Sequence, residues 1–152
     1  MAGLDLVSIH STILSYIESE FSQYEVYEDY ILNEEELKRV DSRVEPFIVI
    51  SWYGLARQEK NSAVAGVRHD EYFSGFDIGV IAPTPKQCRL AINIIVDNLV
   101  GYSYDGVARL IPGTSTSAFV VAERDSTPHL FMAMAEFTFP VNYDDPGSYM
   151  TP

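Results

Sequence analysis

The sequence predicts an α+β fold: a mixed, mainly antiparallel sheet of four to five strands, packed by two helices and carrying a long hairpin loop. Residues 6–21 and 85–100 repeat apolar side chains at every third or fourth position, as amphipathic helices do. The runs 46–53, 72–81 and 129–139 are rich in β-branched and aromatic residues, which favour strands. No helical pattern follows residue 101, so the order is not a repeated strand–helix alternation.

The first helix is predicted from a single apolar stripe, with Asp5 placed to cap its start. The stripe consists of Leu6, Ile9, Ile13, Ile17 and Phe21. Residues 25–32 then alternate weakly between apolar and polar side chains, which predicts a short strand.

Asn33 is followed by three glutamates and then by Lys38 and Arg39. Negative residues at the start and positive residues behind them suit the helix dipole. This pattern predicts a short surface helix or helical turn that ends before Pro46. The run from Pro46 to Tyr53 predicts a buried strand, and the polar, Gly-containing residues 55–67 predict a long loop or the tip of an extended hairpin.

Alternation from Tyr72 to Ile81 predicts another strand. Thr84 is the expected cap of the second helix, with Pro85 in its first turn and Gly101 at its end. Its buried stripe is expected to be Cys88, Ile92, Ile95 and Leu99, while Lys86, Arg89, Asn93 and Asp97 face outward.

Two strands are expected after the second helix, at 117–123 and 129–139, joined by a turn. The polar residues 142–152 include two prolines. We therefore expect one α+β domain over residues 1–141 and a C-terminal arm or disordered tail over 142–152.

Composition limits the possible functions. The net charge of −12 gives no basic footprint for nucleic acid or for an anionic membrane surface. The first 45 residues hold 11 acidic against 3 basic residues, a strongly negative surface. A single cysteine excludes an internal disulfide. We find no signal-peptide pattern and no apolar run of about 20 residues that could span a membrane.

Candidate catalytic chemistry is sparse. His69, Asp70 and Glu71 place an imidazole beside two carboxylates, but neighbouring residues of a strand point to opposite faces, and a polar strand entry is the simpler interpretation. Cys88 falls on the buried helix stripe, so it is expected to be a small core residue. Residues 113–117 resemble a phosphate-binding loop only in composition, because they lack a lysine. We expect no enzyme activity, no metal and no cofactor.

The segment GVRHDEYFSGFDIGVIAPTPKQCRLAINIIVDNLVGY, which starts at Gly66, resembles the central part of tail terminator and tail-completion proteins of long-tailed bacteriophages. The likeness lies in a polar hairpin, an alternating strand, a Thr-Pro turn and a helix that ends at Leu99-Val100-Gly101. It implies a non-enzymatic virion protein, made in the host cytoplasm, that forms a ring of six copies in the tail or neck. No individual functional residue is carried over.

The resemblance further implies two partners, the major tail tube protein and the head–tail connector or stopper protein. DNA would pass through the lumen without specific binding, and an acidic lumen would repel its phosphates. Two alternatives stay open. One is another head–tail joining or minor tail protein of similar fold. The other is a small hydrolase or binding domain that uses His69, Asp70 and Glu71.

The residues between Ala56 and Asp70 are the expected docking loop for an axial partner, the tail tube. Three of the ten basic residues of the chain lie in it. A local positive charge would suit an acidic rim on the partner and would set register and association rate. The candidate docking residues are Arg57, Lys60, Arg68, His69 and Asp70.

Overall fold

The structure is a computed structural model that describes residues 6–29, 36–37, 39–40, 43–64, 67–104, 109–113, 120–123 and 130–141. For residues 39–40, 43, 56–64, 67–71 and 120–123 it describes the backbone alone. The predicted cap Asp5, the turn around residues 124–129 and the arm 142–152 lie outside the described residues.

The described elements comprise two helices and nine strands. They are α1 (Leu6–Glu20), β1 (Glu25–Glu28), β2 (Arg39–Val40), β3 (Arg43–Val44), β4 (Phe47–Trp52), β5 (Ala56–Val64), β6 (Val67–Ala82), α2 (Pro85–Leu99), β7 (Ile111–Pro112), β8 (Val120–Glu123) and β9 (Leu130–Val141). The predicted α+β class is confirmed. Strand β7, the pair β2–β3 and the strand character of β5 were not predicted.

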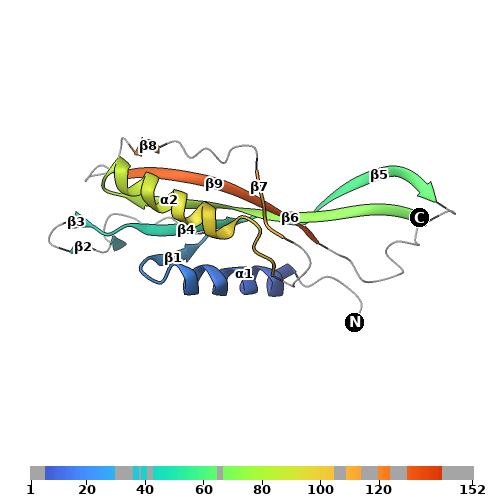
Figure 1. The fold of residues 1–152 in the computed structure, drawn as a ribbon, viewed down its shortest axis with the longest axis horizontal. Coiled ribbons are helices and arrows are strands. Elements are labelled where there is room, and N and C mark those ends of the chain that lie inside the picture. Colours follow the sequence, from blue (N-terminus) through green and yellow to red (C-terminus); the bar gives the residue numbers. More distant parts are fainter. Residues whose placement is uncertain are drawn as a thin grey trace.

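The main sheet has the order β1-β4-β6-β9-β7, with β5 also pairing β6 and β8 also pairing β9. Every pair is antiparallel except β1 with β4. The long central strands β6 and β9 run side by side, and α1 and α2 pack against the sheet (Figure 1). The sheet is therefore mixed but mainly antiparallel, as the sequence predicts.

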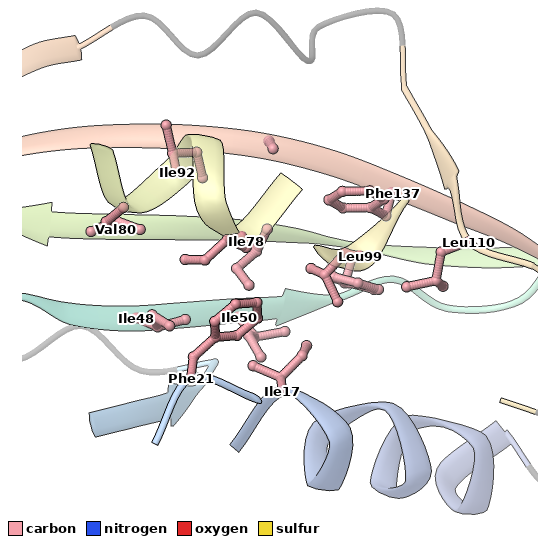
Figure 2. Packing of buried hydrophobic residues seen from close by; sticks show 14 of the residues in the cluster. Ile17, Phe21, Ile48, Ile50, Ile78, Val80, Ile92, Leu99, Leu110 and Phe137 are labelled. Carbon is pink, nitrogen blue, oxygen red and sulfur yellow. The ribbon is translucent and has the colours of Figure 1, made fainter. Parts of the chain in front are cut away.

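Both helices pack on the same face of the sheet. The fully buried residues alternate along the strands, so that Ile48 and Ile50 of β4 share a face with Phe76 and Ile78 of β6. Figure 2 shows Ile17 of α1 and Phe21, just after α1, directed toward β4. Ile92 and Leu99 of α2 lie over β6 and β9. Burial of these large side chains is the main stabilising contribution, at roughly 25 cal/mol for each Å² of apolar surface removed from water.

The second helix follows its predicted signals closely. Thr84 Oγ1 accepts a hydrogen bond from the Gln87 backbone N–H at 3.2 Å, and Pro85 occupies the first turn, where its missing N–H costs nothing. Gly101 follows the helix with φ of +81°, a left-handed conformation that glycine adopts without strain. The buried stripe contains the predicted residues and Ala91.

Within the described residues, the opposite face of the sheet is covered at one end. There Leu37 and Val44 pack with Phe47 of β4 and Leu130 of β9 in a second apolar cluster. The predicted short helix or helical turn after Asn33 lies mostly outside the described residues. Glu36 is in a 3₁₀ conformation, while Arg39 lies in β2, which pairs with β3. The β2–β3 ribbon, which carries the buried Val44, therefore limits any helical turn to the residues before Arg39.

The stretch predicted as a long loop or the tip of an extended hairpin is a hairpin. Strand β6 is 16 residues long, and its first part pairs with β5, from Val64 opposite Val67 to Ala56 opposite Phe73. In Figure 1 this ribbon extends beyond the helices and the other strands. We call residues 56–73, formed by β5 and the adjoining part of β6, the hairpin arm.

Candidate functional site: the hairpin arm and the sheet face at its base

The hairpin arm carries all five predicted docking residues. Arg57 lies on β5 opposite Tyr72, and Arg68 lies on β6 opposite Ala63. Lys60 falls within β5, at a register shift between Glu59 and Ala63. The backbone thus brings the basic residues onto one two-stranded ribbon instead of a loop. Their side chains lie outside the described part of the structure.

His69, Asp70 and Glu71 are consecutive residues of β6 in the arm. Successive side chains of a strand point to opposite faces, so His69 and Asp70 do not share one. Asp70 lies opposite Glu59. The ladder of the arm therefore carries acidic as well as basic residues.

Gly75 marks the base of the hairpin arm. A Cβ added at this position would lie 2.3 Å from the Phe137 carbonyl oxygen and 3.0 Å from Cδ2 of Tyr53. Such contacts are far closer than van der Waals distance, so only glycine fits where β9 and Tyr53 approach β6.

A carboxylate pair lies beside Gly75 on the helix-free face. Asp77 of β6 is directly opposite Glu136 of β9, and the Tyr53 hydroxyl donates a short hydrogen bond to Asp77. Burial, the hydrogen bond to Asp77 and the two negative charges together raise the pKa of Tyr53 well above its usual value of 10. Tyr53 therefore stays a hydrogen-bond donor at any physiological pH. Sequence reasoning missed this group, because its members come from three separate segments.

The helix-free face near the arm also exposes apolar side chains. Phe73 is 36% exposed, Met134 of β9 is 40% exposed, and Ile111 of β7 is 53% exposed. In the ladders Ile111 pairs with Thr138, and Thr138 pairs with Gly75, two residues from Phe73. Met134 lies further along the same face, opposite Gly79. On the helix side of the sheet, α2 also exposes two apolar residues to solvent. These are Leu90 and Ile94, which lie four positions apart and are neighbours on the helix surface.

A serine and a histidine meet between α1 and the sheet. His10 Nε2 lies 3.5 Å from Ser74 Oγ, and Ser74 is buried. The Ser74 hydroxyl donates its only proton to the Tyr53 carbonyl at 3.0 Å. Ser74 can therefore only accept a hydrogen bond from His10, which is the reverse of what a nucleophile and its base require. The contact between His10 and Ser74 therefore fits a structural role.

Cys88 is likewise a core residue. Its thiol is fully buried and donates to the Phe131 carbonyl at 3.0 Å. Burial raises the pKa of the Cys88 thiol, which works against a reactive thiolate. Of the other candidates, Gly113 is described and its N–H donates to the Glu136 carbonyl at 2.8 Å, while residues 114–117 lie outside the described part.

One cavity of about 150 Å³ opens between the end of α1 and the strands β1 and β4. It is lined by Ser22, Gln23, Tyr24, Glu25, Tyr27, Glu45, Pro46 and Phe47. Pockets for small organic ligands are typically about 300 to 1,000 Å³ and mostly apolar, so this polar recess does not fit that class.

Among the residues with described side chains, no group of three His, Cys, Asp or Glu is placed to hold a metal ion. Neither described helix has the length and apolar character needed to cross a membrane.

Comparisons with known proteins found little similarity. No family model matches the chain, and no curated protein matches it. Among solved structures, a chain of one described as "Virion of native gene transfer agent (GTA) particle" is similar, with a TM-score of 0.45 and 14% sequence identity. The match covers 88% of this chain and 90% of that chain. No residue is carried over from it.

Proposed function

We propose that this chain is a virion structural protein that forms a ring at the end of a phage-type tail tube, stops its growth and joins it to the head connector. The hairpin arm is the observation that carries the proposal. A two-stranded ribbon is only marginally stable by itself, so a ribbon that leaves the sheet is expected to be covered on assembly. The segment that resembles tail terminators includes β6, one of the two strands of this ribbon.

The rest of the surface suits assembly better than catalysis. Exposed acidic residues gather around the end of α1 and along β1: Glu18, Glu20, Glu25, Glu28 and Asp29. A negative surface beside a DNA channel would repel phosphate, so that DNA slides past it. The serine–histidine pair described above has the wrong hydrogen-bond direction for a nucleophile, and the non-enzymatic role needs none.

Within this role the hairpin arm is the docking element for the tail tube. Arg57 and Lys60 on β5 and Arg68, His69 and Asp70 on β6 are the proposed contact residues. Charged residues at the rim of an interface mainly set register and association rate. The arm would therefore orient the ring on the tube, while the sheet and helices of neighbouring copies close the ring.

The proposal is tested on the purified protein, alone and mixed with the tail tube protein encoded in the same genome. Light scattering should give about six times the 17.1 kDa mass of one chain, and electron micrographs should show rings and tubes of uniform length. A protein that remains monomeric and leaves tube length unchanged contradicts the proposal. Binding to the connector but not to the tube would favour another joining protein of the neck.

Metal analysis tests the enzymatic alternative. A stoichiometric transition metal in the purified protein, lost on His69→Ala, would favour a site built on His69, Asp70 and Glu71 over the structural role.

A further inference from the structure

Two surfaces of the domain expose charged and apolar side chains together. The first is the outer side of α2. Lys86, Arg89 and Leu90 are exposed there, and their spacing of three and four residues makes them neighbours on the helix surface. Among the described side chains, the cations of Lys and Arg are Lys86, Arg89 and Arg109. Two of these three lie within one turn of α2, which makes this side of an acidic chain locally positive.

The second surface is the helix-free face of the sheet. Asp77 of β6 and Glu136 of β9 lie directly opposite each other, and Met134 lies two residues from Glu136 on the same face. In the described part of the structure, no Lys or Arg side chain contacts either carboxylate, and the donor that Asp77 has is the neutral Tyr53 hydroxyl. Like charges directly opposite in a ladder repel each other, so a cation brought to this face would stabilise it.

The two surfaces match in charge and in apolar character. The outer side of α2 is positive beside Leu90, which is 55% exposed, and the sheet face is negative beside Met134, which is 40% exposed. They lie on opposite sides of the sheet, because α2 packs its buried stripe on the other face. A single chain therefore cannot bring them together, whereas two copies of the chain can. A contact between two different surfaces of one protein is heterologous, and its repetition gives a closed ring or an open filament.

We propose that the outer side of α2 in one copy packs on the helix-free sheet face of the next copy, and that this contact closes the ring. Lys86 and Arg89 donate charge-assisted hydrogen bonds across it, and Asp77 and Glu136 accept them. The exposed apolar residues pack beside these charges, as in other protein interfaces. This inference rests on the proposed function, because it takes the ring as the assembled state, and it names the two surfaces that form the ring.

Charge changes on α2 test the first surface. Lys86→Glu with Arg89→Glu should reduce the mass measured by light scattering from that of the ring to the 17.1 kDa of one chain, because two negative surfaces then meet. Ser11→Glu with Ser15→Glu, both exposed on α1, adds negative charge outside the contact and should leave the ring intact. Circular dichroism of each variant reports whether the domain stays folded.

A change on the sheet tests the second surface independently. Met134→Glu adds a third carboxylate beside Asp77 and Glu136 at an exposed position, and it too should give monomers. Met134→Leu keeps the apolar character and a similar volume, so it should keep the ring. A ring that persists in both folded charge variants, the one on α2 and the one on the sheet, would overturn the proposal.

Cross-linking tests whether the two surfaces meet. Leu90→Cys and Met134→Cys, placed in two separate chains that are co-expressed, should give a dimer cross-linked by a short bismaleimide. Each variant alone should give none, because a heterologous contact does not place two equivalent residues together. Cys88 is buried and can remain in place. Ser15→Cys co-expressed with Met134→Cys is the control and should not cross-link. No cross-link between the two chains, or equal cross-linking of one variant alone, would overturn the proposal.

Assays with the tail tube protein separate this contact from the proposed function. A ring that persists in the charge variants and still caps tubes would reject the contact and keep the function. Rings lost in both charge variants, when wild-type rings leave tube length unchanged, would support the contact and reject the function. A wild-type chain that stays monomeric with and without the tube protein would overturn both.

Discussion

The His10 imidazole stacks on the Trp52 indole, with 4.3 Å between the ring centroids and 17° between the planes. The contact joins α1 to the end of β4. Trp52 is held in turn by Glu28, whose carboxylate accepts its indole N–H at 2.7 Å. Burial lowers the pKa of His10 below 6.5, although the nearby carboxylates of Asp29 and Glu28 partly oppose this shift.

The stacked histidine predicts a loss of stability in mild acid. The folded protein binds a proton at His10 more weakly than the unfolded chain, so the contribution of His10 is complete above about pH 6.5 and is lost as the pH falls below it. His10→Gln keeps a donor for Ser74 but cannot titrate. Between pH 7.5 and pH 5.5 the melting temperature of the wild type should fall by more than that of His10→Gln. Parallel pH profiles would contradict this assignment.

Two adjacent isoleucines of α2 give a matched test of the core. Ile95 is fully buried, whereas Ile94 is 48% exposed. Ile95→Ala should lower the free energy of unfolding by about 2 to 5 kcal/mol, because it leaves a cavity under the helix. Ile94→Ala should change it by about 0.5 kcal/mol or less. Denaturant titration measures both, and a loss below about 0.5 kcal/mol for Ile95→Ala would show that the packing is wrong.

Gly75 should not tolerate a side chain. A methyl group there would meet the Phe137 carbonyl oxygen at 2.3 Å, so Gly75→Ala forces β6 and β9 apart. We expect a loss of about 1 to 3 kcal/mol in the free energy of unfolding. Gly54→Ala is the control, since a Cβ at Gly54 meets nothing within 4 Å. Equal stability of the two variants would rule out the close approach at the base of the arm.

Removal of the Tyr53 hydroxyl should lower the stability of the fold, because Asp77 then faces Glu136 without a hydrogen-bond donor. Tyr53→Phe deprives Asp77 of its donor while Glu136 remains opposite, and we expect a loss of about 1 to 3 kcal/mol. In an Asp77→Asn background the same substitution should cost less, because the carboxylate is gone. Thermal unfolding of the four proteins measures the coupling, and strict additivity would mean that the hydrogen bond contributes nothing.

Charge reversal in the hairpin arm tests the docking role. Arg57, Lys60 and Arg68, all changed to Glu, should leave the domain folded, because surface charges contribute little to stability. Tails assembled with this variant should have irregular lengths or fail to join heads. Lys86 and Arg89, both exposed on α2, changed to Glu serve as the comparison, because they should abolish the ring itself, whereas the arm variant should still form it. Normal tails and infectious particles from the arm variant would exclude the arm as the docking surface.

Local patterns in the sequence were sufficient to predict both helices and the central strands. The stripe of Cys88, Ile92, Ile95 and Leu99 predicted the buried side of α2, and Thr84 predicted its start. These predictions are confirmed because periodic burial and a cap depend on residues close together in the chain.

The candidate site could be predicted only in part. Alternation and composition identified the segment with Arg57, Lys60 and Arg68, but its small polar residues gave no strand signal, and pairing with β6 made it a ribbon. The helical pattern after Asn33 was only partly informative, because Glu36 is in a 3₁₀ conformation but Arg39 already lies in β2. Charge placement has a weak effect on local structure, and the packing of Val44 and Leu37 on the sheet outweighs it.

The sequence by itself determined the α+β class, the buried faces of the helices and the acidic character of the surface. Only the tertiary structure decided that Tyr53 lies beside Asp77 and Glu136 and that Ser74 faces His10. It also decided that the first part of β6 extends beyond β4 and pairs with β5 to form an arm. The physical reason is the distance along the chain over which each effect acts. Propensity and periodicity act over a few residues, whereas contacts between β4, β6 and β9 depend on strand register, which the whole sheet sets at once.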